Sequence, residues 1–337
     1  MASTPKSKPA TAEDVAELAG VSRWTVNRAF KKDASISKRT LDRVMKAAAR
    51  LDYAPDLLAA SLASDRSNLV SLLIDDFANP HKLVMLEALT RVLGAHGLDV
   101  LLVNTASQKD TQDALRTARQ RRVDAAVLIG SQLSDDLIAQ AKGTDHIGKL
   151  IVFARLSSEV QAVSICVDDR SAMAVMTDHV LSGGYSRPLF LAGPQTRSAH
   201  LLRQQTFVEG WQSATGFRPE DHVVGSYDPR QAYRQVTSFL KGCPEDSWPD
   251  VIVCENDALA VGTIDALRHE FGRNVPGDLA VTGFDDTPQA ADQSYQLTTY
   301  RQPISAMAEA LAQVVLGQRD EVGLDRFTGE LVIRRSA

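Results

Sequence analysis

The sequence predicts a small all-α unit that carries a helix-turn-helix motif, followed by a larger α/β unit. Three observations lead to this fold class. The chain has 337 residues, which exceeds what one ordinary core accommodates and suits two or three compact units. Apolar residues recur at helical spacing between residues 11 and 51. From Leu69 onward, short apolar runs alternate with amphipathic stretches, which is typical of parallel sheets covered by helices.

The first helix is expected to begin near residue 12. Thr11 and Asp14 have the spacing of a capping box, and Val15 and Leu18 follow on one helical face. Gly20 then interrupts the pattern and favours a tight turn.

The second helix is expected to start after Ser22, which can cap it, and to run to Phe30. Its apolar side chains face inward: Val26, Ala29 and Phe30. Its other long side chains point outward: Arg23, Trp24, Asn27 and Arg28. An indole ring that points outward between two arginines is unfavourable on a surface that faces only solvent, and it suits contact with DNA. Two short helices joined by a glycine turn form the helix-turn-helix motif.

A third helix is expected to follow Ser37, which can cap it. Four apolar residues of this segment would close the small core: Leu41, Val44, Ala48 and Leu51.

The charge is distributed unevenly along the chain. Residues 1–67 contain 12 Lys and Arg against 8 Asp and Glu, a net charge of +4, whereas residues 68–337 contain 25 against 34, a net charge of −9. Only the N-terminal unit therefore favours a polyanion. Chance variation could also produce a charge of this size, so it is weak evidence by itself.

Seven apolar runs of the larger unit are expected to form buried strands: 69–74, 100–103, 125–129, 150–153, 189–192, 251–254 and 279–282. Ligands of such folds bind beyond the carboxyl ends of the strands. The polar residues found there are Asp75, Asp76, Ser131, Gln132, Arg155, Glu255, Asn256, Asp257, Asp285 and Asp286.

The motifs of the N-terminal unit resemble the headpiece of the lactose-repressor (LacI/GalR) family. They are TAEDVAELAGVS at residues 11–22, Thr25-Val26 with Arg28, and LDYAP at residues 51–55. The resemblance continues into residues 57–62, where that family has its hinge helix. The order of these motifs is more specific than a helix-turn-helix pattern alone.

The larger unit resembles the same family in five motifs: LLIDDFANP at 72–80, LAGP at 191–194, NDALAVG at 256–262, VTGFDD at 281–286 and LTT at 297–299. The resemblance thus covers residues 11 to about 335. It implies a periplasmic-binding-protein-like core of two Rossmann-like subdomains, crossed by three segments near residues 167, 297 and 325.

The resemblance also implies a division of the chain. Residues 1–10 would be a disordered terminus, 11–56 the helix-turn-helix domain, 57–67 the hinge helix and linker, and 68–337 the effector-binding and dimerisation domain. Within the last, the N-subdomain would comprise about 68–167 plus 298–324, and the C-subdomain about 168–297 plus 325–335.

The implied DNA contacts lie on the second helix and around it. Arg23, Trp24 and Arg28 would read bases in the major groove, and Arg28 is the best candidate because arginine can donate two hydrogen bonds to guanine. Trp24 departs from the small or polar residue usual there. Phosphate contacts are implied for Ser22, Thr25, Asn27, Ser37, Thr40 and Tyr53. Leu62 would be a wedge that opens a base step from the minor groove, although this segment alone also fits a plain linker helix.

The resemblance implies a transcription repressor that binds pseudo-palindromic double-stranded DNA as a homodimer or a tetramer. A small-molecule effector would bind between the subdomains, and the first helix after Pro80 would serve the dimer interface. The expected location is the cytoplasm, in association with the nucleoid. Whether the effector releases or promotes DNA binding does not follow from the sequence.

Cleft-lining positions are implied for Asp76, Tyr227, Asn256 and Asp285. Carboxylates and amides can bind vicinal hydroxyls, and an aromatic ring can stack on a sugar face. Two of these side chains also have a structural interpretation, since Asp285 could cap a loop and Tyr227 could be plain packing.

Four further residues are expected to bind the effector, and they stand where the chain departs from the family pattern: His81, Lys82, Arg155 and Phe207. There are three such departures. Phe207 stands where the family has a cleft arginine, Ala154-Arg155 replaces an Asp-Arg pair, and His81-Lys82 replaces paired aromatics. The hypothesis that follows is a sugar-related effector that is anionic or otherwise not a neutral sugar. Arg203 could restore a cation to the cleft, but the sequence does not fix where it points.

No cofactor, metal site or catalytic activity is expected. The sequence has no glycine-rich phosphate loop, HExxH helix or GxSxG elbow. Its three cysteines, Cys166, Cys243 and Cys254, lack metal-site spacing and are expected to be buried thiols. A free-standing solute-binding protein is the alternative, but it would lack a signal peptide and a purpose for residues 11–62.

Overall fold

The computed structural model describes residues 10–30, 35–55, 66–105, 107–130, 147–157, 163–194, 202–319 and 324–337. The chain divides into two compact units, Met1–Ser67 and Asn68–Ala337. The predicted terminal disorder and the predicted hinge helix fall on residues 1–9 and 56–65, which lie outside the described residues.

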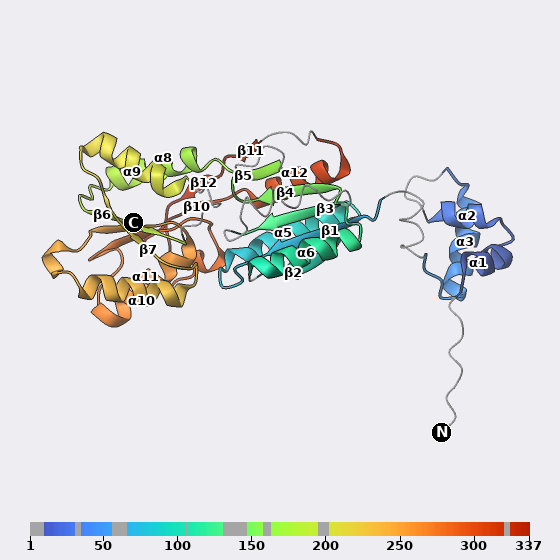
Figure 1. The fold of residues 1–337 in the computed structure, drawn as a ribbon, viewed down its shortest axis with the longest axis horizontal. Coiled ribbons are helices and arrows are strands. Elements are labelled where there is room, and N and C mark those ends of the chain that lie inside the picture. The colour runs from blue at the N-terminus through green and yellow to red at the C-terminus, as the bar shows by residue number, and fades with distance from the viewer. Residues whose placement is uncertain are drawn as a thin grey trace, which may run out of the picture. The chain divides into compact units, whose positions relative to one another are not determined.

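The N-terminal unit contains the three predicted helices, α1 (Ala12–Ala19), α2 (Arg23–Ala29) and α3 (Lys38–Arg50) (Figure 1). Thr11 and Asp14 form the expected capping box on α1. The Oγ atoms of Ser22 and Ser37 accept the backbone N–H groups of Thr25 and Thr40, both at 3.2 Å. Each helix therefore begins at the residue that the sequence indicated.

The core of this unit is built from small and β-branched side chains of all three helices: Val15, Ala16, Ala19, Val26, Ala29, Val44, Ala47 and Ala48. At its edge, the rings of Phe30 and Tyr53 meet edge to face, 5.7 Å apart. Arg43 of α3 donates to the carbonyl oxygens of Ala19 and Gly20, which α1 leaves without helical partners at its end. This contact joins α3 to the turn between α1 and α2.

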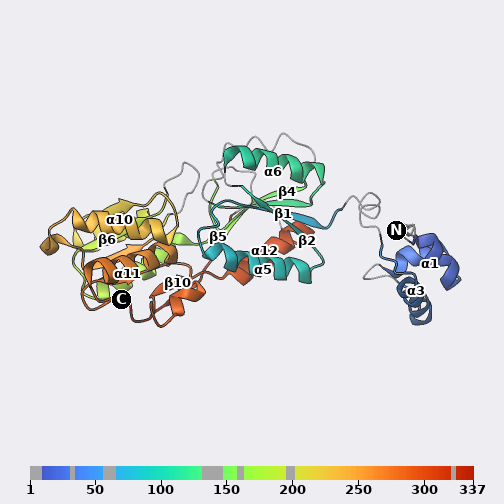
Figure 2. The ribbon, with the colours of Figure 1, turned by 90° about the horizontal axis from the view of Figure 1, so that it is seen from below.

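The larger unit begins with a parallel sheet of six strands in the order β11-β5-β4-β3-β1-β2. The strands are β1 (Leu69–Ile74), β2 (Asp99–Asn104), β3 (Ala125–Ile129), β4 (Lys149–Phe153), β5 (Val163–Val167) and β11 (Leu324–Phe327). Helix α6 (Gln108–Gln120) lies on one face, and α5 (His81–Ala95) and α12 (Ile304–Leu316) lie on the other (Figure 2).

A second parallel sheet has four strands in the order β7-β6-β8-β9. The strands are β6 (Pro188–Ala192), β7 (Glu220–Val223), β8 (Val251–Cys254) and β9 (Ala280–Thr282). Helices α8 (Asp169–Ser182) and α9 (Arg203–Thr215) cover one face, and α10 (Pro229–Lys241) and α11 (Asp257–Phe271) cover the other (Figure 1). Two open parallel sheets with helices on both faces confirm the predicted α/β fold class.

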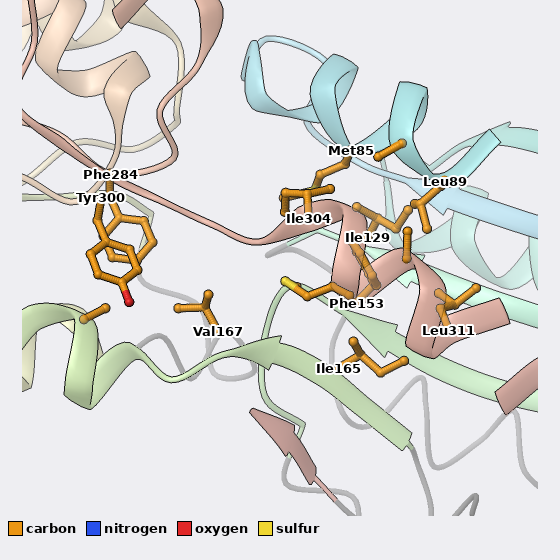
Figure 3. Close-up of a cluster of buried hydrophobic side chains, with 14 of the residues drawn as sticks. Met85, Leu89, Ile129, Phe153, Ile165, Val167, Phe284, Tyr300, Ile304 and Leu311 are labelled. Carbon is orange, nitrogen blue, oxygen red and sulfur yellow. The ribbon is translucent and has the colours of Figure 1, made fainter. Parts of the chain in front are cut away.

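The two sheets are joined through β5, β10 (Thr299–Arg301) and the stretch between β11 and β12 (Glu330–Val332), where β10 pairs antiparallel with β12. Asp286 fixes this pairing, because its carboxylate accepts from Arg301 Nε and from Arg334 Nη2, both at 2.6 Å. One hydrophobic cluster continues through the junction, where the rings of Phe284 and Tyr300 stack 5.1 Å apart (Figure 3).

All seven predicted strands are present within one residue of their expected ends. The apolar-run criterion missed five others, β5, β7, β10, β11 and β12. Cys166 and Cys254 are buried as expected, whereas Cys243 is half-buried, and all three thiols are unpaired. Among the described helices, none has the length and apolar character needed to span a membrane.

Candidate functional site

A cleft opens at the carboxyl ends of the strands, between the two sheets of the larger unit. It holds about 480 Å³ of empty space, its open mouth included. Both sheets and one joining segment contribute its lining residues: Asn79, His81, Lys82, Met85, Gly130, Phe153, Ala154, Arg155, Arg203, Tyr227, Asn256, Asp285 and Gln302. Most of these residues follow strands, namely β1, β3, β4, β6, β7, β8, β9 and β10, so the topology gathers them at one place.

Asp285, Gln302 and His81 form a hydrogen-bonded chain in this cleft. Gln302 Nε2 lies 2.6 Å from Asp285 Oδ1 and 3.3 Å from His81 Nε2. An amide nitrogen has two N–H groups, so Gln302 can donate to both partners only if His81 Nε2 accepts. The proton of the neutral His81 ring then lies on Nδ1.

Within this hydrogen-bonded chain, two buried atoms have no hydrogen-bond partner among the described residues: His81 Nδ1 and Gln302 Oε1. Burial lowers the pKa of His81, the Asp285 carboxylate opposes this, and Lys82 and Arg203 reinforce it. The neutral ring therefore offers one donor, and the amide beside it offers one acceptor. Buried polar atoms without partners are costly, and a bound ligand would satisfy them.

Arg203, at the start of α9, supplies a buried cation to the cleft. Its Nε donates to Asp169 Oδ1 at 2.9 Å, its Nη1 donates to the carbonyl oxygen of Glu255 at 3.0 Å, and its guanidinium lies 3.6 Å from the centre of the Phe284 ring. Burial opposes its charge, but the carboxylates of Asp169, Asp285 and Glu255 raise the pKa of Arg203 above its usual value. Its charge is therefore held in a fixed place.

Tyr227 lines the same wall and is oriented by Glu255. Its hydroxyl donates to Glu255 Oε2 at 2.9 Å, and the same oxygen accepts the backbone N–H of Gly193 at 2.5 Å. Burial raises the pKa of Glu255, and burial together with Glu255 raises that of Tyr227 well above its usual value. Gly193 has no room for a side chain, because a Cβ there would lie 2.1 Å from the Tyr227 ring.

The opposite wall carries two more cations. Lys82 Nζ lies 3.7 Å from Asp75 Oδ1, and both side chains are buried. Gly130 leaves the space for Asp75, because a Cβ at this glycine would lie 1.9 Å from that same oxygen. Arg155 is 3% exposed and donates to the carbonyl oxygen of Leu156 at 3.3 Å.

Six of the eight predicted effector-binding residues line the cleft: His81, Lys82, Arg155, Tyr227, Asn256 and Asp285. Asn256 also caps α11, since its Oδ1 accepts the N–H of Leu259 at 3.0 Å. The structure thus brings together residues that are up to about two hundred positions apart in the sequence.

Two predicted cleft residues are placed elsewhere and must be corrected. Phe207 is fully buried, with its ring 5.6 Å from that of Phe190 and 6.1 Å from that of Trp211. Asp76 is half-buried outside the lining, and it is the preceding carboxylate, Asp75, that pairs with Lys82. Ser131 and Gln132 lie outside the described residues.

The sequence analysis did not identify Gln302 and Asn79 as cleft residues, and it could not establish where the Arg203 side chain points. Gln302 directly follows β10, so the rule that singled out polar residues after strands would have found it had this three-residue strand been recognised. The described residues contain no group of His, Cys, Asp and Glu side chains arranged to hold a metal ion.

The predicted DNA-reading helix presents its polar side chains outward. Arg23, Trp24 and Asn27 are exposed, and Thr25 and Arg28 are half-buried. The Trp24 ring is 65% exposed, and the Arg28 guanidinium lies 4.7 Å from its centre. Ser37 is exposed, whereas Thr40 and Tyr53 are half-buried. Leu62 lies outside the described residues.

Family comparisons match both units. Residues 11–56 match "Bacterial regulatory proteins, lacI family", and residues 67–315 match "Periplasmic binding proteins and sugar binding domain of LacI family". The transcriptional repressor PurR of Proteus mirabilis is 26% identical over 334 residues, which cover 97% of this chain and 96% of the relative. The sucrose operon repressor of Escherichia coli is 29% identical over 341 residues, which cover 97% and 99%.

Solved structures share the fold. The lac repressor dimer bound to operator and the anti-inducer ONPF superposes with a TM-score of 0.83 at 24% identity, covering 98% of this chain and 99% of the other. The complex of the regulator CelR with cellobiose gives a TM-score of 0.71 at 23% identity, covering 97% and 100%.

The relatives are transcriptional repressors, and the two matched regions together take in α2 and the cleft. The chain therefore belongs to the LacI family of bacterial regulatory proteins, and it is a DNA-binding transcription regulator controlled by a small-molecule effector.

Proposed function

We propose that this regulator is a repressor whose effector carries both hydroxyl groups and a negative charge. The cleft lining supports this, because it includes three cationic side chains, Lys82, Arg155 and Arg203, against the single carboxylate of Asp285. Asp75 and Asp169 orient two of these cations from behind. The donor on His81 and the acceptor on Gln302 suit a carboxylate or phosphate oxygen and a hydroxyl group, respectively.

Calorimetric titration with matched pairs of ligands tests this proposal. Each pair consists of a neutral hexose and its uronic acid or 6-phosphate, so that the two members differ at C6 alone. We expect the charged member to bind at least tenfold more tightly. Tight binding of neutral hexoses alone would overturn the proposal. Arg155→Gln should reduce the preference, whereas Arg218→Gln, an exposed site on the second subdomain, should leave it unchanged.

The proposed DNA site is the headpiece, residues 11–56, with Arg23, Trp24 and Arg28 reading bases. Ser22, Thr25, Asn27, Ser37, Thr40 and Tyr53 would contact phosphates. Arg28→Ala should relax the base preference at one operator position by about 1–3 kcal/mol. Equal weakening on every sequence would assign Arg28 to a phosphate instead.

Leu62 is proposed as the minor-groove wedge of a hinge segment at residues 57–67. Leu62→Ala should weaken operator binding far more than effector binding. Similar losses in both measurements would refute the wedge. The coupling between operator binding and effector binding must be reciprocal. If the effector changes the affinity for operator DNA by some factor, operator DNA should change the affinity for the effector by the same factor.

We propose a homodimer, or a tetramer built from it, that binds a pseudo-palindromic operator, because one small headpiece buries too little surface for specific affinity. The outward face of α5 is the proposed interface, and Leu83 on it is 72% exposed. Leu83→Asp should shift sedimentation from dimer to monomer.

The protein is proposed to act in the cytoplasm at the nucleoid, as a regulator rather than an enzyme.

A gel-shift assay separates this proposal from a free-standing solute-binding protein. Duplexes selected by the full chain from a random pool should be retarded and should contain inverted half-sites. Failure to enrich any duplex would favour the solute-binding alternative.

A further inference from the structure

Four arginines gather where α6 ends: Arg116, Arg119, Arg121 and Arg122. Arg119 is half-buried and the others are exposed. The unit that contains them, residues 68–337, carries a net charge of −9. The positive charge of the cluster is therefore opposite in sign to the net charge of its own unit.

Three of these side chains, Arg116, Arg119 and Arg122, surround one shallow hollow together with Gln120. Arg116 pairs with Asp113 at 3.0 Å, but both side chains are largely exposed, so solvent screens this pair. Within the described part of the chain, the side chains of Arg119, Arg121 and Arg122 have neither a hydrogen bond nor an ion pair. The hollow thus presents uncompensated guanidinium groups.

The cluster lies near the amino ends of β1 and β3, close in space to residues 68 and 69, with which the larger unit begins. Asp124, two residues after Arg122, donates its backbone N–H to the carbonyl oxygen of Leu69 at 2.8 Å and accepts the N–H of Asn68 at 3.0 Å. The N-terminal unit ends at Ser67, directly before Asn68. The segment 56–67 spans at most about 40 Å even when fully extended, so it tethers the headpiece within about that distance of Asn68.

We propose that this arginine cluster binds backbone phosphates of the DNA that flanks the operator. Guanidinium groups match phosphate geometry in bidentate hydrogen bonds, and a hollow lined by three of them offers several such donors to a phosphate group. The tether raises the local concentration of flanking DNA, so a weak additional contact adds to the affinity of the whole protein. The inference rests on the DNA binding proposed for the headpiece.

Duplex length and salt dependence test the proposal on the full chain. The operator recovered by selection is prepared at minimal length and with about one helical turn added on each side. The variant is Arg119→Gln/Arg122→Gln. Its control, Arg230→Gln/Arg234→Gln, removes the same charge from α10 of the second subdomain.

On the extended duplex, the cluster variant should bind about tenfold more weakly than wild type, and the slope of log K against log salt should fall by about 2. On the minimal duplex, the variant and wild type should agree, and the control should match wild type on both. Matching slopes for the variant and wild type on the extended duplex would overturn the inference. That result would leave the arginines as cations that stabilise the carboxyl end of α6, visible as a lowered Tm.

A wild-type chain that gains no affinity from the added flanks would also overturn it. A wild-type chain that retains no duplex of either length would instead refute DNA binding by the headpiece, and the inference would fall with it.

Discussion

Arg203 and Asp169 form a buried ion pair that joins the first turns of α9 and α8, with Nε and Oδ1 2.9 Å apart and the two side chains 6% and 7% exposed. Removal of the arginine leaves a carboxylate in the interior without its cation. We expect Arg203→Met to lower the free energy of unfolding by about 3–5 kcal/mol in urea titrations. The double variant with Asp169→Asn should recover part of this loss, and a loss for Arg203→Met below about 1 kcal/mol would contradict the assignment.

Near pH 6.5 the folded protein should hold His81 protonated to a smaller fraction than the unfolded chain does, and the neutral ring should carry its proton on Nδ1. Burial lowers its pKa below that of the unfolded chain, so unfolding takes up a proton at mildly acidic pH. The stability that this group contributes is present above about pH 6.5 and is lost as the pH falls below that value. NMR of histidine-labelled protein can follow the ring directly, and the signal absent from His81→Gln identifies it. A ring that titrates near pH 6.5, or carries its proton on Nε2, would contradict the hydrogen-bonded chain with Gln302.

Asp257 should make stability decrease as the pH rises. Burial beside the Asp285 carboxylate raises the pKa of Asp257 to about 8, although Thr287 and Thr299 donate hydrogen bonds to it. A pKa above the unfolded value of about 3.9 gives stability that is fully present below pH 4 and is lost as the pH approaches 8.

In urea titrations, the free energy of unfolding of wild type should therefore fall relative to that of Asp257→Asn between pH 5.5 and pH 8.5. Asp246→Asn, at an exposed site on the same subdomain, serves as the control. A difference that does not change with pH would show that Asp257 is ionised throughout.

Gly20→Ala should loosen the helix-turn-helix without changing the larger unit. Gly20 has φ +61°, and a Cβ there would lie 2.9 Å from Arg43 Nη2, which caps α1. The backbone strain alone should cost about 1 kcal/mol. Hydrogen exchange of the full chain should accelerate in α1 and α2. Gly97→Ala, at φ +74° with no neighbour within 4 Å, measures the backbone cost without the displaced arginine. Unchanged exchange in α1 and α2 would mean that the turn adapts.

The strands that form the cleft could be predicted because each is a continuous apolar run, as at Ala125–Ile129. The edge strand β7, with the sequence EDHV, offers no such run, because its residues are mostly exposed. The helix caps were predictable because Thr11, Ser22 and Ser37 act on backbone groups only three residues away.

Side-chain direction within the cleft could not be predicted in the same way. Arg203 and Phe207 are one helical turn apart and lie on the same face of α9. Arg203 reaches the cleft, whereas Phe207, one turn further along, lies between Phe190 and Trp211. How far α9 extends from the cleft into the core depends on its packing against the sheet, and no local pattern encodes that.

The exposed indole on α2 gives the protein an intrinsic optical signal. Of the three tryptophans, Trp211 and Trp248 are 2% and 6% exposed, whereas Trp24 is 65% exposed. Water-soluble quenchers should therefore reach Trp24 fluorescence selectively. A duplex that covers α2 would shield that emission and leave the two buried tryptophans as an internal reference, so that operator occupancy could be followed in solution without a dye.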